Sequence, residues 1–182
     1  MEYNKTIKLK NGKEAILING TRENAADVLK VFVDTNAETD FLASYADENT
    51  FTVENEAEYL DAQTKSDNAI ELIAYVEGNP AGCAGICPTG TKSKEKHRAE
   101  FGISILKEYW GIGIGQALMD SCIELAKRAG YEQLELQVVG DNTKAYNLYK
   151  KVGFVEFGRN PKGFKSRFCG DQELIYMLLE LR

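Results

Sequence analysis

The most informative segment of the sequence is Glu100-Phe-Gly-Ile-Ser-Ile-Leu-Lys-Glu-Tyr-Trp-Gly-Ile-Gly-Ile-Gly-Gln-Ala-Leu-Met119. It opens with a run typical of a β-strand, Phe101 to Leu106, and leads into three alternating glycines, Gly111, Gly113 and Gly115. An apolar stripe with helical spacing begins directly after them. This order predicts an anion site, because the first N–H groups of a helix have no internal acceptor and glycines let an anion approach the backbone.

The glycine spacing decides which kind of phosphate ligand remains possible. A dinucleotide fingerprint needs G-x-G-x-x-G, but its third glycine would be Gln116 counted from Gly111, or Leu118 counted from Gly113. A nucleoside-triphosphate loop needs a closing Gly-Lys-Ser/Thr, which is absent. The observed spacing is G-x-G-x-G. From the loop alone, a phosphate site and a simple turn between strand and helix are equally good interpretations.

A second patterned segment follows the loop: Val139-Gly-Asp-Asn-Thr-Lys-Ala-Tyr-Asn-Leu-Tyr-Lys-Lys-Val-Gly-Phe154. Its pattern is Asn-x-x-Ala-x-x-Leu-Tyr-x-x-x-Gly-Phe, beginning at Asn142. Each residue also has a purely structural interpretation. Asn142 is a favoured helix cap, Ala145 and Leu148 are core residues in either case, and Tyr149 lies on the apolar stripe as a core aromatic would.

Together, the glycine loop and this second segment resemble the two signature segments of the GNAT superfamily of N-acetyltransferases, which use acetyl-CoA. The resemblance runs from about residue 69 to the C-terminus. The earlier part is similar in element order, with some likeness at Glu38-Thr39-Asp40-Phe41. The family loop usually begins with Arg or Gln, where this chain has Trp110, and a basic residue is common where it has Ile112. The resemblance therefore implies a pyrophosphate held by the loop backbone.

The resemblance implies acetyl-CoA as co-substrate and no metal. The loop amides would bind the pyrophosphate, the end of the preceding strand would bind the pantetheine arm, and an N–H near Ile105 would polarise the thioester carbonyl. Tyr149 is then the expected general acid that protonates the leaving thiolate. The expected cofactor-binding residues are Ile103, Ser104, Ile105, Trp110, Gly111, Ile112, Gly113, Ile114, Gly115, Gln116, Asn142 and Tyr149.

The acceptor amine must lose a proton before it attacks, because free alkylamines have a pKa near 10.4. Glu100 is the expected general base, acting through a water, since it lies on the strand just before the cofactor-binding segment. Two alternatives remain for this side chain. It could face solvent, or it could pair with Arg98 or Lys96.

The whole chain predicts an α/β fold of the α+β type, with one domain over residues 1–182. The expected order is a hairpin at 6–18 with its turn at Asn11-Gly12, two helices, a three-strand meander, a helix, a strand, a helix and two closing strands. The resemblance implies a mostly antiparallel central sheet with helices on both faces. It also implies a splay between the strands around 98–106 and 134–139, which gives the pantetheine arm its slot.

Residue patterns place several of these elements. The first helix, after a Thr21 cap, should bury a stripe of Ala25, Val28, Leu29, Phe32 and Val33. A second helix should begin at Thr52. The closing strands are expected at 154–157 and 173–181, with the loop between them carrying several basic residues. These residues are Arg159, Lys162, Lys165 and Arg167.

Composition narrows the location and the partners. The formal net charge of −6 argues against nucleic-acid binding, which would show a basic excess. No apolar run approaches the ~18 residues that a membrane helix needs, and the N-terminus lacks the apolar core of a signal peptide. Four scattered cysteines and a single histidine make a zinc site unexpected. We expect a cytoplasmic protein with reduced thiols.

The acceptor is the least determined partner. Residues 31–64 hold nine acidic side chains and no Lys or Arg, which favours a cationic small-molecule amine, although such residues can also be solvated surface. The basic closing loop would instead favour an acceptor with a carboxylate. A protein N-terminus is a further possible acceptor, and a non-catalytic acetyl-CoA sensor is a further possible function. A homodimer is possible, since dimers are frequent in the family.

Overall fold

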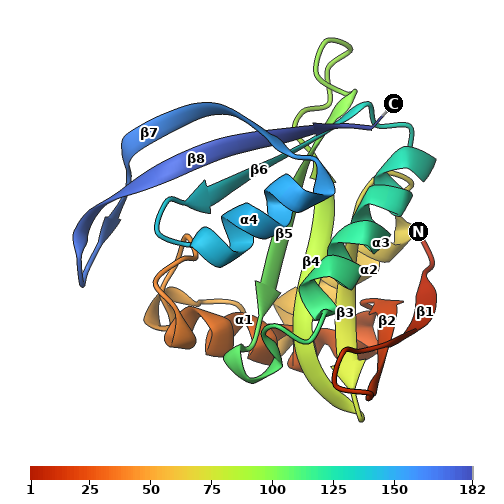
Figure 1. The fold of residues 1–182 in the computed structure, drawn as a ribbon. Helices are drawn as coiled ribbons and strands as arrows, with labels where there is room; N and C mark the ends of the chain where they lie inside the picture. Colours follow the sequence, from red (N-terminus) through yellow and green to blue (C-terminus); the bar gives the residue numbers. More distant parts are fainter. Residues whose placement is uncertain (182) are drawn as a thin grey trace.

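The structure is a computed structural model that describes residues 1–181. One eight-stranded sheet runs through it, in the order β1-β2-β3-β4-β5-β6-β8-β7. Helices cover both faces, with α1 and α2 on one face and α3 and α4 on the other (Figure 1). The strands are β1 (Asn4–Lys8), β2 (Glu14–Asn19), β3 (Ile70–Val76), β4 (Asn79–Pro88), β5 (Arg98–Ile105), β6 (Gln133–Val139), β7 (Val155–Ser166) and β8 (Gly170–Glu180). The helices are α1 (Ala25–Glu38), α2 (Val53–Lys65), α3 (Ile114–Arg128) and α4 (Thr143–Val152), with short 3₁₀ turns η1 (Arg22–Asn24), η2 (Ala46–Glu48) and η3 (Lys107–Tyr109).

Neighbouring strands are antiparallel with one exception. β5 and β6 are parallel, and their pairing covers only three residue pairs, Arg98 with Gln133, Ala99 with Leu134 and Glu100 with Glu135. Beyond Glu100, β5 continues to Ile105 beside β4, while β6 continues beside β8. The two strands therefore part in the middle of the sheet. The predicted mixed α/β sheet, mostly antiparallel with a splay between these two strands, is confirmed.

Two cores form because strand residues alternate between the two faces. The larger core lies under α3 and contains Leu118, Cys122 and Leu125 with residues such as Leu72 and Leu134 from the sheet. The smaller core lies under α1 and α2 and includes Val31, Leu60 and Ile73. Successive residues of β3 thus serve opposite cores. This alternation also decides which side chains of β3, β4 and β5 face α1 and α2.

The buried stripe of α1 differs from the prediction. Ala25, Val28 and Val31 are buried, whereas Phe32 is 42% exposed. Val31, which was not expected in the stripe, packs in the smaller core with Leu60 and Ile73, so the prediction of Phe32 as a core residue is wrong. Phe32 instead contributes to a cavity described below.

The closing strands are longer than predicted, and their connection is correspondingly short. β7 continues to Ser166 despite Pro161 and Gly163, because register shifts between Asn160 and Phe164 accommodate the extra residues as an irregularity in the ladder. The strands β7 and β8 form a long curved arm at one edge of the sheet (Figure 1). Three of the four basic residues expected in a loop therefore lie on β7, and only Arg167 lies in the turn.

Candidate active site

The glycine loop has the geometry of an anion cradle. Gly111 has φ +80° and Gly113 has φ +109°, a region that residues with a Cβ rarely adopt. Gly113 is the N-cap of α3. Within residues 1–181, the N–H groups of Gly111, Ile112 and Gly113 have no backbone acceptor, and the first N–H groups of α3 add to them. The loop thus presents several unpaired donors at the positive end of a helix dipole.

Trp110 holds the loop in place. Its indole Nε1 donates a hydrogen bond to the carbonyl of Ile105 at 2.7 Å, which ties the loop to the end of β5. The amide of Lys10, in the N-terminal hairpin, donates to the carbonyl of Ile112 at 3.0 Å. The ammonium of Lys144 lies 5.6 Å from the Trp110 ring centroid. The tryptophan therefore gives the loop a structural anchor where a charged or amide side chain is usual in the family.

A cavity of about 440 Å³ lies against this loop, and we name it the loop cavity. The lysines at its wall, Lys10, Lys144 and Lys151, supply positive charge that the loop's own side chains lack. Ten of the twelve expected cofactor-binding residues line it: Ile103, Ser104, Ile105, Trp110, Gly111, Gly113, Gly115, Gln116, Asn142 and Tyr149. Ile112 and Ile114 do not, because Ile112 packs against the larger core and Ile114 is buried in it.

The gap between β5 and β6 opens toward the loop cavity. At the closed end of the gap, Arg98 binds Glu135 through two hydrogen bonds, of which the Nη2–Oε2 contact is 2.7 Å. Beyond Glu100, the β6 side of β5 has no strand partner in the part of the chain described. The residues at that free edge, Ile103 to Ile105, also line the cavity. The backbone groups that face this edge, apart from the Ile105 carbonyl that Trp110 binds, are available to an extended ligand in the manner of an added strand.

Tyr149 projects from α4 into the loop cavity, with 7% of its surface exposed. Its ring packs against Phe101 at 6.4 Å and Phe154 at 5.9 Å between centroids. Within the described chain, its hydroxyl makes no hydrogen bond to a protein group. Burial raises the pKa of this phenol, so it keeps its proton at neutral pH. The phenol is therefore a protonated donor without a protein partner.

Asn142 serves as the cap of α4, as the simpler interpretation of this residue predicted. Its Oδ1 accepts a hydrogen bond from the amide of Ala145 at 3.3 Å. The residue also lines the loop cavity. The capping role and a ligand contact are thus compatible, since the side chain has a second polar end.

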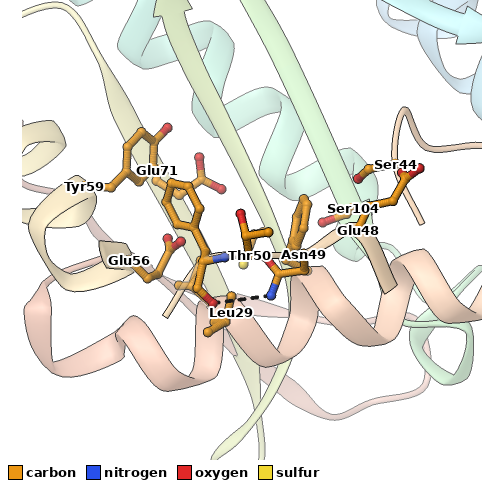
Figure 2. Close-up of a pocket in the computed structure, with 13 residues that line it drawn as sticks. Leu29, Ser44, Glu48, Asn49, Thr50, Glu56, Tyr59, Glu71 and Ser104 are labelled. Atoms are coloured by element: carbon orange, nitrogen blue, oxygen red, sulfur yellow. Dashed lines mark hydrogen bonds between the residues drawn. The ribbon is translucent and has the colours of Figure 1, made fainter. Parts of the chain in front are cut away.

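A second cavity, of about 410 Å³, lies on the opposite face of the sheet, and we name it the α1–α2 cavity. Figure 2 shows the side chains that line it, with Glu56, Tyr59 and Glu71 toward one end and Ser104 toward the other. Its lining residues are Val28, Leu29, Phe32, Ser44, Glu48, Asn49, Thr50, Phe51, Glu56, Tyr59, Glu71, Cys83 and Ser104. Ser104 lines both cavities. The two cavities therefore approach each other at Ser104, near the open end of β5.

Two carboxyl groups stand out in the α1–α2 cavity. Burial raises the pKa of Glu71 to about 8, and the neighbouring Glu56 carboxylate adds to this shift. Burial also raises the pKa of Glu56, which is 8% exposed. The phenol of Tyr59 has its pKa raised by burial and by Glu71. No Lys or Arg is among the residues that line this cavity.

The raised pKa of Glu71 predicts how stability depends on pH. The unfolded side chain has a pKa near 4.3, so between pH 5 and pH 8 the folded protein holds a proton that the unfolded chain has lost. Stability contributed by this group is therefore greatest at low pH and falls as pH rises toward 8, by up to about 4 kcal/mol. Glu71→Gln should remove that slope, which urea unfolding at pH 5 and pH 8 would measure. Equal slopes in both proteins would contradict the expectation.

Glu100, the expected general base, is exposed and lines neither cavity. It lies on β5 opposite Cys87 of β4, four residues before Ser104. It forms no ion pair with Arg98, which is engaged by Glu135. Its role in catalysis therefore stays a prediction.

The acidic stretch of residues 31–64 has several separate roles in the structure. Only Glu48 and Glu56 of its nine acidic residues line the α1–α2 cavity. Asp40 accepts hydrogen bonds from Ser166 at 2.5 Å and from Gln172, so it supports the β7–β8 arm. Others lie in surface ion pairs, such as Glu54 with Arg22.

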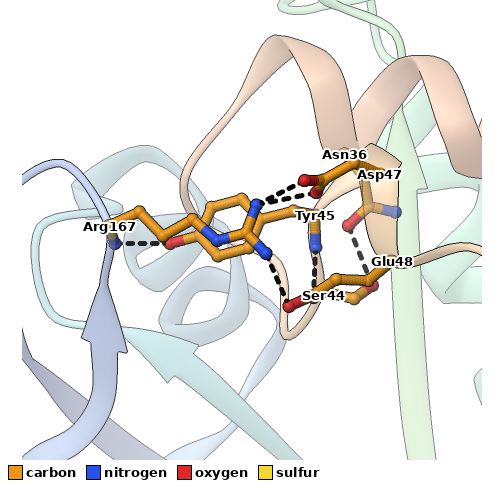
Figure 3. Close-up of polar contacts among 6 residues, drawn as sticks. All are labelled: Asn36, Ser44, Tyr45, Asp47, Glu48 and Arg167. Atoms are coloured by element: carbon orange, nitrogen blue, oxygen red, sulfur yellow. Dashed lines mark hydrogen bonds and ion pairs between the residues drawn. The ribbon is translucent and has the colours of Figure 1, made fainter.

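Arg167, at the turn of the β7–β8 arm, binds the segment between α1 and α2. Its guanidinium contacts Asp47 at 2.7 Å and Glu48 at 3.0 Å, and lies 4.1 Å from the ring centroid of Tyr45 (Figure 3). Its backbone amide donates to the Tyr45 hydroxyl at 2.7 Å. Among the four basic residues considered for the acceptor site, Arg167 pairs with Glu48, which lines the α1–α2 cavity. Arg159 pairs with Glu156 and Glu173. None of the four lines either cavity.

Glu71 and Tyr59 line the α1–α2 cavity, although the sequence pattern did not predict them as site residues. The available signal was a single carboxylate inside the apolar strand Ala69-Ile-Glu-Leu-Ile-Ala74. A buried strand with one ionisable side chain must place that group in a cavity or against a partner. Tyr59 gave no comparable signal, because an aromatic on a helix is usually packing.

The fold and the cavity beside the glycine loop define a class of protein. A family model for the acetyltransferase (GNAT) family matches residues 37–154, which is more than half of the chain. The chain belongs to the GNAT acetyltransferase family, and the resemblance drawn from its two signature segments is confirmed.

Solved structures share this architecture. An acetyltransferase of the GNAT family from Streptococcus pneumoniae has 29% identity and a TM-score of 0.87, over 91% of this chain and 99% of that one. The yncA protein of Salmonella typhimurium, solved with its cofactor acetyl-CoA, has a TM-score of 0.81 over 91% of this chain and 93% of its own. Its identity is 17%, so it supports the fold alone.

Curated relatives match over shorter segments. The L-amino acid N-acetyltransferase AaaT of Escherichia coli K12 is 31% identical over 93 residues, which is 50% of this chain and 57% of that protein. An N-alpha-acetyltransferase of Sulfurisphaera tokodaii is 32% identical over 108 residues, or 58% of this chain and 64% of its own. The match thus spans a little over half of these relatives' length.

Proposed function

We propose that this protein is an acetyl-CoA-dependent N-acetyltransferase acting on a primary amine of a small molecule. The observation that carries the proposal is the pair of cavities on opposite faces of β5 that approach each other at Ser104. Such an arrangement lets two substrates reach one point from two sides. Acetyl-CoA occupies the loop cavity, and the amine occupies the α1–α2 cavity.

The loop cavity supports the cofactor half of the proposal. The unpaired loop amides and the nearby lysines bind the pyrophosphate, and the free edge of β5 binds the pantetheine arm. The family and the acetyl-CoA complex of the yncA structure support the same ligand. When bound, acetyl-CoA supplies the activated acetyl group.

The chain's own groups then serve the transfer. The amine nitrogen attacks the thioester carbon, the carbon–sulfur bond breaks, and the sulfur leaves with the electron pair. A backbone N–H near Ile105 stabilises the developing oxyanion. The phenol of Tyr149 gives its proton to the sulfur, which suits a group that burial keeps protonated. Solvent, with Glu100 as the sequence-predicted base, takes the proton that the amine loses, and solvent returns a proton to the Tyr149 phenolate.

The α1–α2 cavity supports a small cationic acceptor. Its lining combines aromatic side chains with carboxyl groups and includes no Lys or Arg that would bind an acceptor's carboxylate.

The described chain contains no helix long and apolar enough to cross a membrane. Its four cysteines are free thiols, which supports the proposed cytoplasmic location.

Release of free CoA thiol from acetyl-CoA would test the proposal. The purified protein would be assayed with polyamines, aminoglycosides, amino acids and short peptides. We expect turnover with small cationic amines. Turnover only with peptides would favour a protein N-terminus as acceptor. Absence of turnover while acetyl-CoA raises the melting temperature would instead favour a non-catalytic sensor.

A further inference from the structure

Glu56 and Glu71 form a carboxyl pair that lacks a counter-ion. Glu56 is 8% exposed, and both residues line the α1–α2 cavity (Figure 2). In residues 1–181, neither side chain makes a hydrogen bond or an ion pair. Buried carboxyls are normally paired or hydrogen-bonded, because an isolated charge in a low-dielectric site is costly. The pair therefore favours a cationic ligand.

The rest of the cavity fits a cation carried on an apolar chain. Phe32 and Phe51 are 42% and 49% exposed and lie on its wall, where aromatic faces attract ammonium groups. Among the described residues, no group of three or more His, Cys, Asp or Glu side chains is placed to hold a metal ion. Two carboxyls beside aromatic walls suit an alkylammonium group.

Glycines on β4 and β5 leave space beside the Glu71 carboxyl. A Cβ at Gly85 would lie 2.2 Å from Glu71 Oε2, so the carboxyl occupies the space that a side chain on β4 would fill. Gly85 pairs with Gly102 of β5, and a Cβ on Gly102 would meet nothing within 4 Å. Open space thus continues from the Glu71 carboxyl across β4 to β5. Ser104 lies two residues further along on the same face.

Sheet dimensions give the distance from the carboxyl to the reaction point. Strands lie about 4.8 Å apart and rise about 3.4 Å per residue, so the Glu71 carboxyl is roughly 8 Å from the backbone at Ser104. This is beyond the ~3 Å at which a base takes a proton directly from the attacking nitrogen. An extended chain advances roughly 1.25 Å per bond, so three to five methylenes separate two nitrogens by about 5–7.5 Å.

We propose that Glu71 and Glu56 bind a second, non-reacting ammonium group of the acceptor, so that the preferred acceptor is a linear diamine or polyamine whose reacting nitrogen lies at Ser104. This inference rests on the proposed acetyltransferase function and names its substrate class. It assigns the acidic character of this region to two particular side chains, one of them outside residues 31–64.

The charges around the pair define how binding depends on pH. The groups that face Glu71 are Glu56 and Tyr59 from α2 and Cys83 and Cys87 from β4, and Glu48 lines the same cavity from the segment between α1 and α2. Glu100 on β5 acts on Cys87. None is cationic. Because burial and the Glu56 carboxylate raise the pKa of Glu71 to about 8, diamine affinity should rise as pH increases to about 8 and fall again as the amine deprotonates near pH 10.4. In Glu71→Gln, diamine affinity should no longer rise as pH increases to about 8.

Matched substrates provide the test. With saturating acetyl-CoA, kcat/KM would be measured for α,ω-diamines of three to five carbons and for n-alkylamines of the same length. A charge-assisted contact predicts a diamine preference of about 10- to 100-fold. The preference should fall by the same factor in Glu71→Gln and decrease in Glu56→Gln. It should persist in Glu58→Gln, which alters an exposed residue of α2 that lines neither cavity.

The outcomes separate the two proposals. Equal turnover of monoamines and diamines, or a preference unchanged in Glu71→Gln, would overturn the diamine subsite and leave the acetyltransferase standing. No turnover of any amine would overturn acetyl transfer to small amines. Calorimetric titration of 1,4-diaminobutane into the CoA-bound protein then decides the subsite by itself. Binding that Glu71→Gln weakens at least 10-fold supports the subsite, and absence of binding overturns it.

Discussion

Replacing Tyr149 with phenylalanine should lower kcat by about 100- to 10,000-fold, the usual effect of losing a positioned general acid. An isolated thiol has a pKa of roughly 8.5, so its anion leaves slowly unless a proton is supplied as the carbon–sulfur bond breaks. The Tyr149 phenol is the protonated group that projects into the loop cavity from α4. Steady-state kinetics with saturating acetyl-CoA and the best amine from the panel would measure the loss.

The surroundings of Tyr149 indicate that Tyr149→Phe removes the hydroxyl without disturbing the packing of the ring. The ring contacts with Phe101 and Phe154 do not involve the hydroxyl, which has no protein partner in the described chain. Tyr149→Phe should therefore keep the melting temperature and change KM for acetyl-CoA by only a few-fold. Because burial raises the pKa of the phenol above its usual value near 10, the wild-type enzyme should show no loss of activity from Tyr149 deprotonation below pH 10.

Tyr146 offers a matched control on the same helix. Its hydroxyl donates to Glu156 Oε2 at 3.2 Å, and the residue lines neither cavity. Tyr146→Phe should leave kcat within about two-fold of wild type, because its hydroxyl reaches neither cavity. If Tyr149→Phe behaved like this control, Tyr149 would be a packing residue and the thiolate would take its proton from water.

The parts of the fold that could be predicted are those that depend on residues close together in the sequence. Glycines at 111, 113 and 153 occupy positive φ values that other residues avoid, and Asn142 caps the helix that follows it. These requirements act within a few residues of chain, so they leave a readable pattern. The loop cavity is assembled mostly from such segments, which is why most of its expected residues line it.

The α1–α2 cavity could not be predicted in the same way, because its walls come from distant segments. Glu71 matters only because β3, β4 and β5 are in register and two glycines on the neighbouring strands leave space beside it. Register is set by tertiary pairing, which the spacing of one strand does not reveal. The length of β7 was hidden for a related reason, since its irregular pairing with β8 absorbs a proline and glycines that normally end a strand.

The second large effect concerns the glycine loop: Gly115→Val should weaken acetyl-CoA binding by about 100-fold or more. Gly115 is in the first turn of α3 and lines the loop cavity. A Cβ there would already lie 3.2 Å from Ile105 Cδ1 and 3.4 Å from Leu148 Cδ2, so the branched methyls of valine must project into the ligand's space. Loss of two charge-assisted hydrogen bonds from the loop amides, at about 1.5–3 kcal/mol each, accounts for the expected factor.

Gly115 is a better test of the loop than its neighbours because its φ is not in the left-handed region. A substitution at Gly111 or Gly113 would strain the backbone and confuse loss of the fold with loss of the ligand site. Glycine within a helix is unfavourable by about 0.5–1 kcal/mol relative to alanine, so a side chain at position 115 should not destabilise α3 itself. The melting temperature without ligand should accordingly stay close to that of the wild-type protein.

Isothermal titration calorimetry with acetyl-CoA would measure the effect, and Gly115→Ala provides an intermediate step. Its single methyl needs only a few tenths of an ångström of movement from the flexible ends of Ile105 and Leu148, so its affinity should lie between those of wild type and Gly115→Val. A graded loss from glycine to alanine to valine would tie the affinity to space beside the loop amides. Wild-type affinity in Gly115→Val would instead mean that acetyl-CoA does not bind in the loop cavity, and the proposed role of the Gly111–Gln116 backbone would be wrong.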